Sequence, residues 1–337
     1  MNRRFIQPPE WHRQKAVWTA WPYLENEWPY ITQSQKEFIK FCEMISRFGK
    51  QDLHIAFPSQ SIFSEVQSSF DGVIFTPHIM KYADSWFRDT GPIFVTDKDG
   101  YPFSLCFGFN GWGNKYVMPG DTEVAKTIAA KVGYPRVIIP MILEGGSIDV
   151  DGKGTGLSTK QCLLNPNRNP EKTQEEIERL VMNAYGLSKL IWINEGLLND
   201  HTDGHIDNIA RFVAPGKVMV MEPSGNDDPN AEVYQRIITT LENETDAKGR
   251  KLEVIKIPSP GKIIIDDQIM PASFLNFVIT NGAVIIPTYD SRYAEKAVKK
   301  IGNYFPGRVA IGLSSHYILT GGGSFHCITQ QEPLFQI

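Results

Sequence analysis

The chain has 337 residues, of which 42% are hydrophobic and 21% are charged, and its formal net charge at pH 7 is -4. These proportions are ordinary for a globular protein, and no apolar run approaches the roughly 20 residues of a membrane-spanning helix, so no membrane association is expected. The acidic balance and the lack of a dense Lys/Arg stripe argue against a nucleic-acid partner and suit a small cationic one better.

Neither the start of the chain nor its cysteines indicate secretion. Residues 1–9 carry two arginines but no apolar core and no small-residue cleavage site, so no signal peptide is predicted and a cytoplasmic location is expected. Cys42, Cys106, Cys162 and Cys327 lie far apart without a C-x-x-C pair, which argues against a zinc site or a disulfide framework. No metal or organic cofactor is therefore predicted.

Five helices are predicted from the spacing of apolar residues, and they alternate with short runs rich in Val, Ile and Phe. Their ranges are 33–48, 122–132, 172–186, 230–246 and 291–302. No low-complexity segment or long linker divides the chain, so residues 1–337 are expected to form one catalytic domain. The sequence does not indicate the oligomeric state, and a homo-oligomer stays open.

A polar or glycine-rich stretch that runs directly into an apolar strand recurs between these helices. The instances are residues 88–95, 144–150, 204–213, 272–279 and 321–328. Five helices and five such segments suggest five repeated units, which would form an α/β propeller with the polar segments facing its axis. A doubly wound α/β sheet would produce the same alternation and remains the alternative.

Polar residues inside these segments are unusual, because Asp, Asn and Gly are depleted in strands. Four of the five segments contain a chemically useful side chain at a similar place: Asp89, Glu144, His205 with Asp207, and Cys327. If the units share an axis, these side chains converge. The sequence therefore predicts a single site built from distant parts of the chain.

Cys327 is the candidate nucleophile. It follows three consecutive glycines, residues 321–323, which let the backbone approach a ligand closely at an entropic cost that a purely structural strand would avoid. The alternative is a small buried hydrophobe, which is the interpretation that we adopt for the other three cysteines.

His205 and Asp207 are two residues apart and would point to the same face of a strand, so both would enter one pocket. This pair could supply the acid/base and charge partners of a cysteine nucleophile. A surface histidine beside a solvated carboxylate is the structural alternative. A metal site formed with His201 would need a helix, which Gly204 disfavours.

Asp89 lies in a stretch where aromatic residues precede an Arg-Asp pair. A carboxylate beside aromatic rings suits a flat delocalised cation such as guanidinium, which pairs at its edge and stacks on its face. An ion pair with Arg88 that holds the turn is the alternative, and Arg88 itself is expected to be structural, because a second cation would repel the substrate.

Glu144 is the candidate third carboxylate for substrate binding. The alternatives are that it orients His205 or caps a turn. Trp21, Trp86 and Trp112 are candidate walls of the pocket, with core packing as the alternative for each.

These motifs, read together, resemble those of the guanidine-modifying enzyme superfamily and, within it, the agmatine deiminase or bacterial-type peptidylarginine deiminase family. The matching stretches are Trp86–Pro92, Phe109–Gly113, Leu143–Ser147, Asp203–Asn208 and Gly321–Gln331, in that order along the chain. The resemblance implies a pentein fold, which is a five-bladed α/β propeller of pseudo-fivefold ββαβ-type repeats.

The same resemblance implies a hydrolytic deimination without a metal or organic cofactor. Cys327 would attack the guanidinium carbon to give a covalent amidino-cysteine, Asp89 and Asp207 would hold the guanidinium nitrogens, and His205 would donate a proton to leaving ammonia and then activate water. With agmatine as substrate the product would be N-carbamoylputrescine, on a route to putrescine and other polyamines. A bound cation and an imidazolium would both stabilise the thiolate.

Two departures from the family pattern loosen the substrate assignment. Many relatives have Asp-Thr-Asn-Gly-His where residues 201–205 read His-Thr-Asp-Gly-His, and the glycine-rich motif often has Asn in place of Ser324. Free arginine and peptidylarginine therefore remain alternative substrates. A cysteine amidohydrolase with a Cys327–His205–Asp207 triad, and a cation-binding module without turnover, are the alternatives from other functional classes.

Overall fold

The computed structural model describes residues 5–335. Its longer helices are α1 (Ile31–Phe48), α2 (Gln60–Val66), α5 (Val124–Val132), α7 (Gln174–Tyr185), α8 (Ala231–Asn243) and α9 (Ala294–Gly302). Single-turn helices are α3 (Phe87–Thr90), α4 (Gly111–Asn114) and α6 (Lys160–Leu163). Among the helices of this described part, none is both long enough and apolar enough to cross a membrane.

The five predicted helices are confirmed, and their ends are set by local signals. They correspond to α1, α5, α7, α8 and α9, each within three residues of the expected ends. Helix α7 begins with a capping box between Thr173 and Glu176, which satisfies backbone donors that a helix N-terminus leaves unpaired. It ends at Gly186, whose φ of 73° is readily adopted by glycine.

Eighteen strands alternate with these helices. They are β1 (Gln14–Ala20), β2 (Asp52–Phe57), β3 (Thr76–Ile79), β4 (Ile93–Thr96), β5 (Pro102–Gly108), β6 (Arg136–Ile142), β7 (Asp149–Val150), β8 (Thr155–Thr159), β9 (Lys189–Ile193), β10 (Ala210–Ala214), β11 (Lys217–Glu222), β12 (Glu253–Pro258), β13 (Ile264–Ile265), β14 (Gln268–Ile269), β15 (Val278–Ile279), β16 (Ala283–Pro287), β17 (Val309–Leu313) and β18 (Thr329–Pro333), counted over residues 5–335.

One strand–strand–helix–strand pattern occurs five times. In the sheets β4-β5-β6, β7-β8-β9, β10-β11-β12 and β15-β16-β17, the first strand pairs antiparallel with the second, and the third returns after a helix to pair parallel with the second. The fifth sheet, β18-β1-β2-β3, follows the same rule but takes its first strand from the other end of the chain. The described sheets are mixed, and none closes into a barrel.

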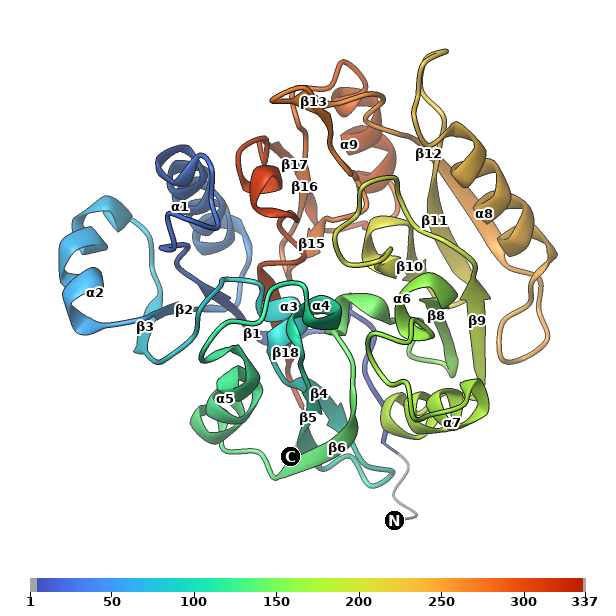
Figure 1. The fold of residues 1–337 in the computed structure, drawn as a ribbon, viewed down its shortest axis with the longest axis horizontal. Helices are drawn as coiled ribbons and strands as arrows, with labels where there is room; N and C mark the ends of the chain where they lie inside the picture. The colour runs from blue at the N-terminus through green and yellow to red at the C-terminus, as the bar shows by residue number, and fades with distance from the viewer. Residues whose placement is uncertain (1–4, 336–337) are drawn as a thin grey trace.

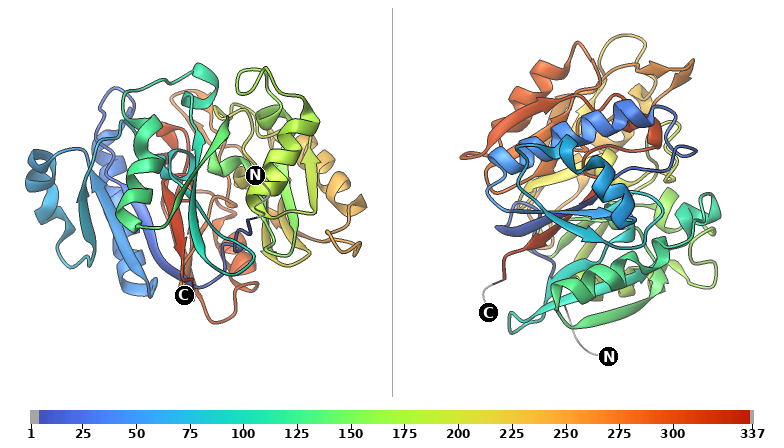
Figure 2. Two further views of the ribbon diagram at one scale, coloured as in Figure 1. Left: turned by 90° about the horizontal axis from the view of Figure 1, so that it is seen from below. Right: turned by 90° about the vertical axis from the view of Figure 1, so that its left-hand side faces the viewer.

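The helices lie on the outside of this arrangement. Figure 1 shows α1, α5, α7, α8 and α9 toward the periphery, with the short α3 and α4 near the middle. Figure 2 shows β18, in red, between the blue and green parts of the chain, where it pairs with β1. Apolar side chains fill the space between each sheet and its helix; in β16, for example, all five residues are buried. Helix burial against these sheets is the main hydrophobic contribution to folding.

The polar segments differ from the prediction in one respect: their chemically useful residues precede the strands instead of lying on them. His205 and Asp207 belong to the 3-10 turn before β10, and Asp89 belongs to α3, before β4. Likewise, Cys327 stands in the turn that leads into β18. Asp and Asn favour turns because their side chains bond to nearby backbone groups, which explains why these residues lie in the turns before the strands.

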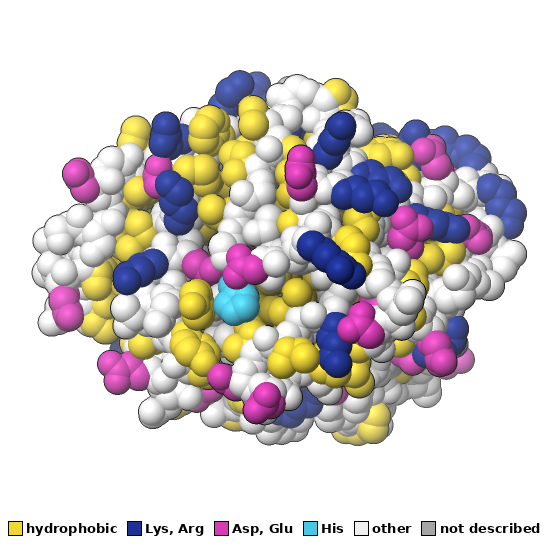
Figure 3. Space-filling view, turned by 90° about the horizontal axis from the view of Figure 1, so that it is seen from above, with side chains coloured by type: hydrophobic (Ala, Val, Ile, Leu, Met, Phe, Trp, Pro, Cys, Tyr) yellow, Lys and Arg dark blue, Asp and Glu magenta, His cyan; other side chains and the backbone are white. Residues whose placement is uncertain are grey.

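Basic and acidic side chains are interspersed over the face shown in Figure 3. Opposite charges form surface pairs such as Lys40–Glu43 and Lys126–Glu123, which contribute little individually to stability.

Candidate active site

Four of the predicted residues meet around Gly146, in the turn before β7. A β-carbon at this glycine would lie 2.7 Å from His205 Nδ1 and 3.0 Å from both Asp207 Oδ2 and Asp89 Oδ1. The Cys327 Sγ lies 3.8 Å from Asp207 Oδ2 and completes the group. Residues that are more than 200 positions apart in sequence therefore form one buried polar cluster, and only glycine leaves enough space at its centre.

The thiol of Cys327 is buried, with only 4% of the residue exposed. Gly323 gives it room, since a β-carbon there would come within 3.0 Å of Sγ and 2.8 Å of the Trp86 ring. Burial, together with the Asp207 and Asp89 carboxylates, raises the pKa of the Cys327 thiol well above its usual range. Without a bound cation the thiol is therefore protonated at neutral pH.

Asn276 is a member of the site that the sequence analysis missed. Its Nδ2 donates to Cys327 Sγ at 3.1 Å and to Asn208 Oδ1 at 2.8 Å, while its Oδ1 accepts from the backbone N–H groups of His326 and Cys327 at 2.9 and 3.3 Å. It comes from segment 272–279, the one polar segment for which no residue was nominated. An asparagine in the one repeat without a nominated residue was the available signal.

Asp89 is held by two donors and is not paired with Arg88. Its Oδ2 accepts from Trp112 Nε1 at 2.9 Å, and its Oδ1 accepts from Gly146 N at 3.0 Å. Burial, together with Asp207, raises the pKa of the Asp89 carboxyl, although His205 opposes the shift. The Arg88 guanidinium instead donates to His326 O, Gln330 and Gln331, which agrees with the expected structural role.

The imidazole of His205 is fully buried and has a different neighbour on each side. Its Nδ1 lies 3.7 Å from Asp89 Oδ1, and its Nε2 lies 4.0 Å from Glu144 Oε2. Neither ring nitrogen has a hydrogen-bond partner among the described residues. Burial opposes protonation, but the Asp89 carboxylate, with Cys162 and Glu144, outweighs it and raises the pKa of His205 well above its usual range. The ring is thus an imidazolium whose Nδ1–H points toward the Gly146 cluster.

Asp207 has one carboxylate oxygen engaged and one free. Oδ2 contacts the His326 ring at 2.7 Å, whereas Oδ1 is buried without a hydrogen-bond partner among residues 5–335. Burial raises the pKa of this carboxyl, but the hydrogen bond and charge of His326, followed by His205, reverse the effect and leave the pKa below its usual range. Asp207 is therefore an ionised acceptor with unused capacity, an arrangement that favours a cationic ligand.

Glu144 lies behind His205 and does not line the cavity. Its Oε1 accepts from Arg168 Nε at 3.0 Å in a completely buried ion pair, and Arg168 also binds Asp203. We expected Glu144 to contact substrate; its position instead matches the alternative in which it orients His205.

A cavity opens beside the thiol. Its lining consists of Glu27, Asp84, Trp86, Asp89, Trp112, Tyr116, Met118, His201, Thr202, Gly321, Gly322 and Cys327. No lysine or arginine belongs to this lining. The walls are thus acidic and aromatic, which favours a cation with an apolar stem.

Two of the three predicted tryptophans line this cavity. Trp86 stacks on Trp28 with ring centroids 5.1 Å apart, and both indole N–H groups donate to Asp84, at 2.9 and 3.0 Å. Burial raises the pKa of Asp84 to about 6, against these hydrogen bonds. Trp112 has a left-handed φ of 52° that places its indole N–H against Asp89.

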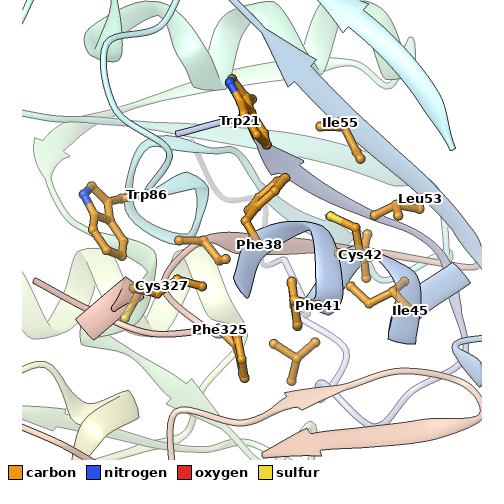
Figure 4. Close-up of a cluster of buried hydrophobic side chains, with 14 of the residues drawn as sticks. Trp21, Phe38, Phe41, Cys42, Ile45, Leu53, Ile55, Trp86, Phe325 and Cys327 are labelled. Carbon is orange, nitrogen blue, oxygen red and sulfur yellow. The ribbon is translucent and has the colours of Figure 1, made fainter. Parts of the chain in front are cut away.

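Trp21 does not reach the cavity. It packs edge-on against Phe38 and Phe70, and Figure 4 shows it on the far side of Phe38 from Cys327. In this cluster Phe325 stacks on Phe41 with centroids 4.5 Å apart, so the turn that carries the thiol is anchored in the core. For Trp21, core packing is the observed arrangement.

One buried group contains metal-binding atoms. Single ligand atoms of Glu144, Cys162 and His205 lie within 4.8 Å of one another, a combination that suits zinc. Arg168, already bound to Glu144, places a fixed positive charge beside this group and opposes a second cation. Two of the three remaining cysteines, Cys42 and Cys106, are buried among apolar side chains, as expected for structural cysteines.

The chain is similar to several known proteins. Residues 6–333 match the model of the Porphyromonas-type peptidyl-arginine deiminase family. A Shewanella protein named "Putative agmatine deiminase" is 35% identical over 98% of this chain and 94% of its own length.

Solved structures show the same similarity. The agmatine deiminase of Enterococcus faecalis superposes with a TM-score of 0.92 at 32% identity, covering 98% of this chain and 96% of that one. An agmatine deiminase of C. jejuni with substrate bound superposes with a TM-score of 0.90 at 27% identity, covering 99% and 97%.

Proposed function

Because the chain belongs to the Porphyromonas-type peptidyl-arginine deiminase family, we propose that it hydrolyses agmatine to N-carbamoylputrescine and ammonia. The observation that supports this proposal most strongly is the group of one thiol, one imidazolium and two carboxylates around Gly146. The relatives named as agmatine deiminases match nearly the whole chain and support the same reaction.

The carboxylates account for the choice of a guanidinium. Asp207 has an unused oxygen, and Asp89 stands across Gly146 from it, so a planar cation between them would gain an edge contact from each. Trp86 and Trp112 line the same cavity and offer ring faces.

The thiol is activated by the substrate. Cys327 is protonated in the free enzyme because burial and two carboxylates raise its pKa. A bound guanidinium neutralises those carboxylates and stabilises the thiolate, so the thiol proton leaves to solvent on binding. Asn276 Nδ2–H, at 3.1 Å, then stabilises the thiolate directly. Substrate binding and nucleophile activation are thus one event.

The chemistry proceeds in two displacements. Sγ of Cys327 attacks the guanidinium carbon, His205 Nδ1–H protonates the departing nitrogen, and the C–N bond breaks to release ammonia and leave an amidino-cysteine. Water then adds to the same carbon while neutral His205 takes one of its protons. The C–S bond breaks, and the remaining proton of the new hydroxyl passes to the departing thiolate as the carbonyl of the ureido product forms. The proton released to solvent on binding converts the neutral ammonia to ammonium.

The acidic lining of the cavity favours agmatine over arginine. Glu27 and Asp84 belong to this lining together with Asp89, while lysine and arginine are absent from it. An alkylammonium would be attracted there, whereas the α-carboxylate of arginine would meet two acidic side chains without a cationic partner. Peptidylarginine, which is neutral beyond its guanidinium group, would gain less electrostatic attraction from this lining than agmatine.

A cysteine amidohydrolase triad has less support. Asp207 contacts His326, not His205, and His205 has carboxylates on both sides instead of a direct bond to the thiol. A binding module without turnover would leave the nucleophile and its amide donor without a task.

For the fold, we propose that the five repeats form the blades of a propeller in one catalytic domain, and that the enzyme acts in the cytoplasm. The shared strand order of five sheets supports the propeller, as does the convergence of their polar turns at Gly146.

Release of ammonia and a ureido product from agmatine, arginine and a blocked arginyl peptide tests the proposal. Agmatine should react fastest, Cys327→Ser should abolish turnover, and mass spectrometry of a quenched reaction should find the amidino adduct on Cys327. Equal turnover of arginine would overturn the substrate assignment, and no adduct in an active enzyme would overturn the covalent step. Cys42→Ser is the matched control, because that cysteine lies in the apolar core.

A further inference from the structure

A histidine next to the nucleophile lies between two carboxylates. The ring of His326 contacts Asp207 Oδ2 through Nδ1 at 2.7 Å and Glu10 Oε2 through Nε2 at 2.8 Å. His326 is 4% exposed and Asp207 is 1% exposed. The mechanism above uses Asp207 but assigns no task to the other two residues.

Both contacts require a proton on the ring. An ionised carboxylate only accepts hydrogen bonds, so a histidine bonded to two of them must donate from both nitrogens and is an imidazolium. The pKa of each carboxyl is below its usual range. For Glu10, burial opposes ionisation but the charges of Arg211 and His326 outweigh it, and the corresponding balance at Asp207 has already been described.

The directions of these two pKa shifts distinguish a fixed arrangement of charges, which we call the clamp (Glu10, His326 and Asp207), from a proton relay. A relay would need Glu10 or Asp207 to take up a proton readily, and their depressed pKa values oppose this. A fixed positive charge between two fixed negative charges is the stable arrangement. The line of three groups therefore holds charge in place.

Glu10 is itself tightly held at the opposite end from the substrate cavity. Its Oε1 accepts from Ile279 N at 3.1 Å, and its Oε2 also binds Arg211. A second cavity, lined in part by Glu10, Trp11 and His326, opens on this side. Glu10 is thus reached from a different cavity from the one that contains the thiol.

We propose that Glu10 is a positioning residue for deimination: it binds Nε2 of the His326 ring, and Nδ1 of the same ring holds the Asp207 carboxylate in place for the guanidinium. This role rests on the proposed function, and Glu10 does not touch the substrate. The other charged groups around it are Arg211, Arg88 and Arg308, and Asp149 binds Arg211 from the far side.

Glu10→Gln is the principal variant, because the amide keeps an oxygen for Ile279 N but removes the charge. Without that charge the His326 ring loses one of its two carboxylate partners, so it no longer holds Asp207 Oδ2 in place. KM for agmatine at neutral pH should rise about tenfold or more, with a smaller change in kcat.

A double-mutant cycle separates positioning from general damage. If Glu10 acts through His326, Glu10→Gln should have little further effect in a His326→Asn background, whereas multiplied effects would overturn the proposal. Asp149→Asn is the matched control: it weakens the ion pair of Arg211 without touching His326 and should leave KM for agmatine unchanged. Thermal unfolding of each variant is measured alongside.

A readout without substrate keeps the two proposals distinguishable. In protein labelled with ¹⁵N-histidine, NMR should show both ring nitrogens of His326 in hydrogen bonds to carboxylates in the unsubstituted chain, and Glu10→Gln should change the signal of Nδ1, which contacts Asp207, as well as that of Nε2. An unchanged Nδ1 signal in Glu10→Gln overturns the clamp even if agmatine is turned over. A changed Nδ1 signal in a protein inactive on every guanidine would sustain the clamp and contradict the deiminase assignment.

Discussion

The amide of Asn276 gives the sharpest test of how the thiolate is stabilised. Asn276→Asp replaces the Nδ2 donor that lies 3.1 Å from Cys327 Sγ but keeps an oxygen for the two backbone N–H groups of the nucleophile turn. Those two donors favour the ionised form of the new carboxyl. The substitution thus exchanges a hydrogen-bond donor for a negative charge with little change in shape.

The expected magnitude follows from the lost hydrogen bond. A hydrogen bond to a charged group contributes about 1.5–3 kcal/mol, which corresponds to about a 10- to 150-fold loss in kcat/KM. Repulsion between carboxylate and thiolate acts in the same direction, so this range is a lower bound. The pKa of the Cys327 thiol, already raised by burial and by Asp207 and Asp89, should rise further.

Two assays measure the effect. Steady-state formation of the ureido product gives kcat/KM, and the rate of inactivation by iodoacetamide against pH gives the pKa of the thiol in free enzyme. Because protonation of the new carboxyl removes its charge, the loss of activity should be smaller at low pH than at high pH.

Asn208→Asp is the matched control. It adds a charge behind Asn276 and retains an acceptor for its amide, without replacing the donor to sulfur. The reasoning is refuted if Asn276→Asp lowers kcat/KM less than twofold with an unchanged thiol pKa, or if both variants lose activity equally.

Three further predictions concern the surroundings of the thiol. Because the pKa of Asp84 is about 6, this carboxyl is ionised above that pH, and KM for agmatine should rise as pH falls through it; in Asp84→Asn the KM should be high at every pH. Trp112→Phe removes the donor to Asp89 Oδ2 and should raise KM by roughly tenfold or more, corresponding to about 1.5–3 kcal/mol, in initial-rate measurements. Arg168→Met leaves the buried Glu144 charge unpaired and should lower the free energy of unfolding by about 3–5 kcal/mol in urea titrations.

Each of these has a clear contrary result. A KM that does not change between pH 7 and pH 5 would remove Asp84 from recognition of the substrate's amine. An unaltered KM in Trp112→Phe would mean that the indole N–H does not support Asp89. Unchanged stability of Arg168→Met would show that the buried pair is no stronger than an apolar contact, and Lys40→Met, at an exposed pair, provides the baseline.

The helices and the convergence of the candidate side chains could be predicted from the sequence because both have strong local signals. Amphipathic spacing identified α1 and α9, while glycines marked the turns that carry Glu144 and Cys327. The turn that holds His205 and Asp207 before β10 was missed because an apolar run follows directly and suggests a strand that begins earlier.

Residues that act over long distances left no comparable signal. Glu10 lies in an irregular segment, and its proposed role depends on its contacts with His326 and Arg211, which are more than 200 positions away in sequence. Trp21 could not be separated from Trp86 by composition, since both are aromatic residues in apolar surroundings, and only packing shows which one faces the cavity. Asn276 could have been found from the repeat, because its unit was the only one without a nominated side chain.

The pairing of β18 with β1 has a consequence for how the protein is made. The nucleophile turn leads into β18, and this strand finds its partner at the opposite end of the chain. A nascent chain on the ribosome can assemble the intermediate repeats in order, but it cannot complete the sheet behind Cys327 until β18 emerges. The long loop between β1 and β18 also makes this pairing entropically demanding. Catalytic competence should therefore appear abruptly once β18 is free to pair, and a chain that stops before β18 should be inert toward guanidines while most of its secondary structure is already in place.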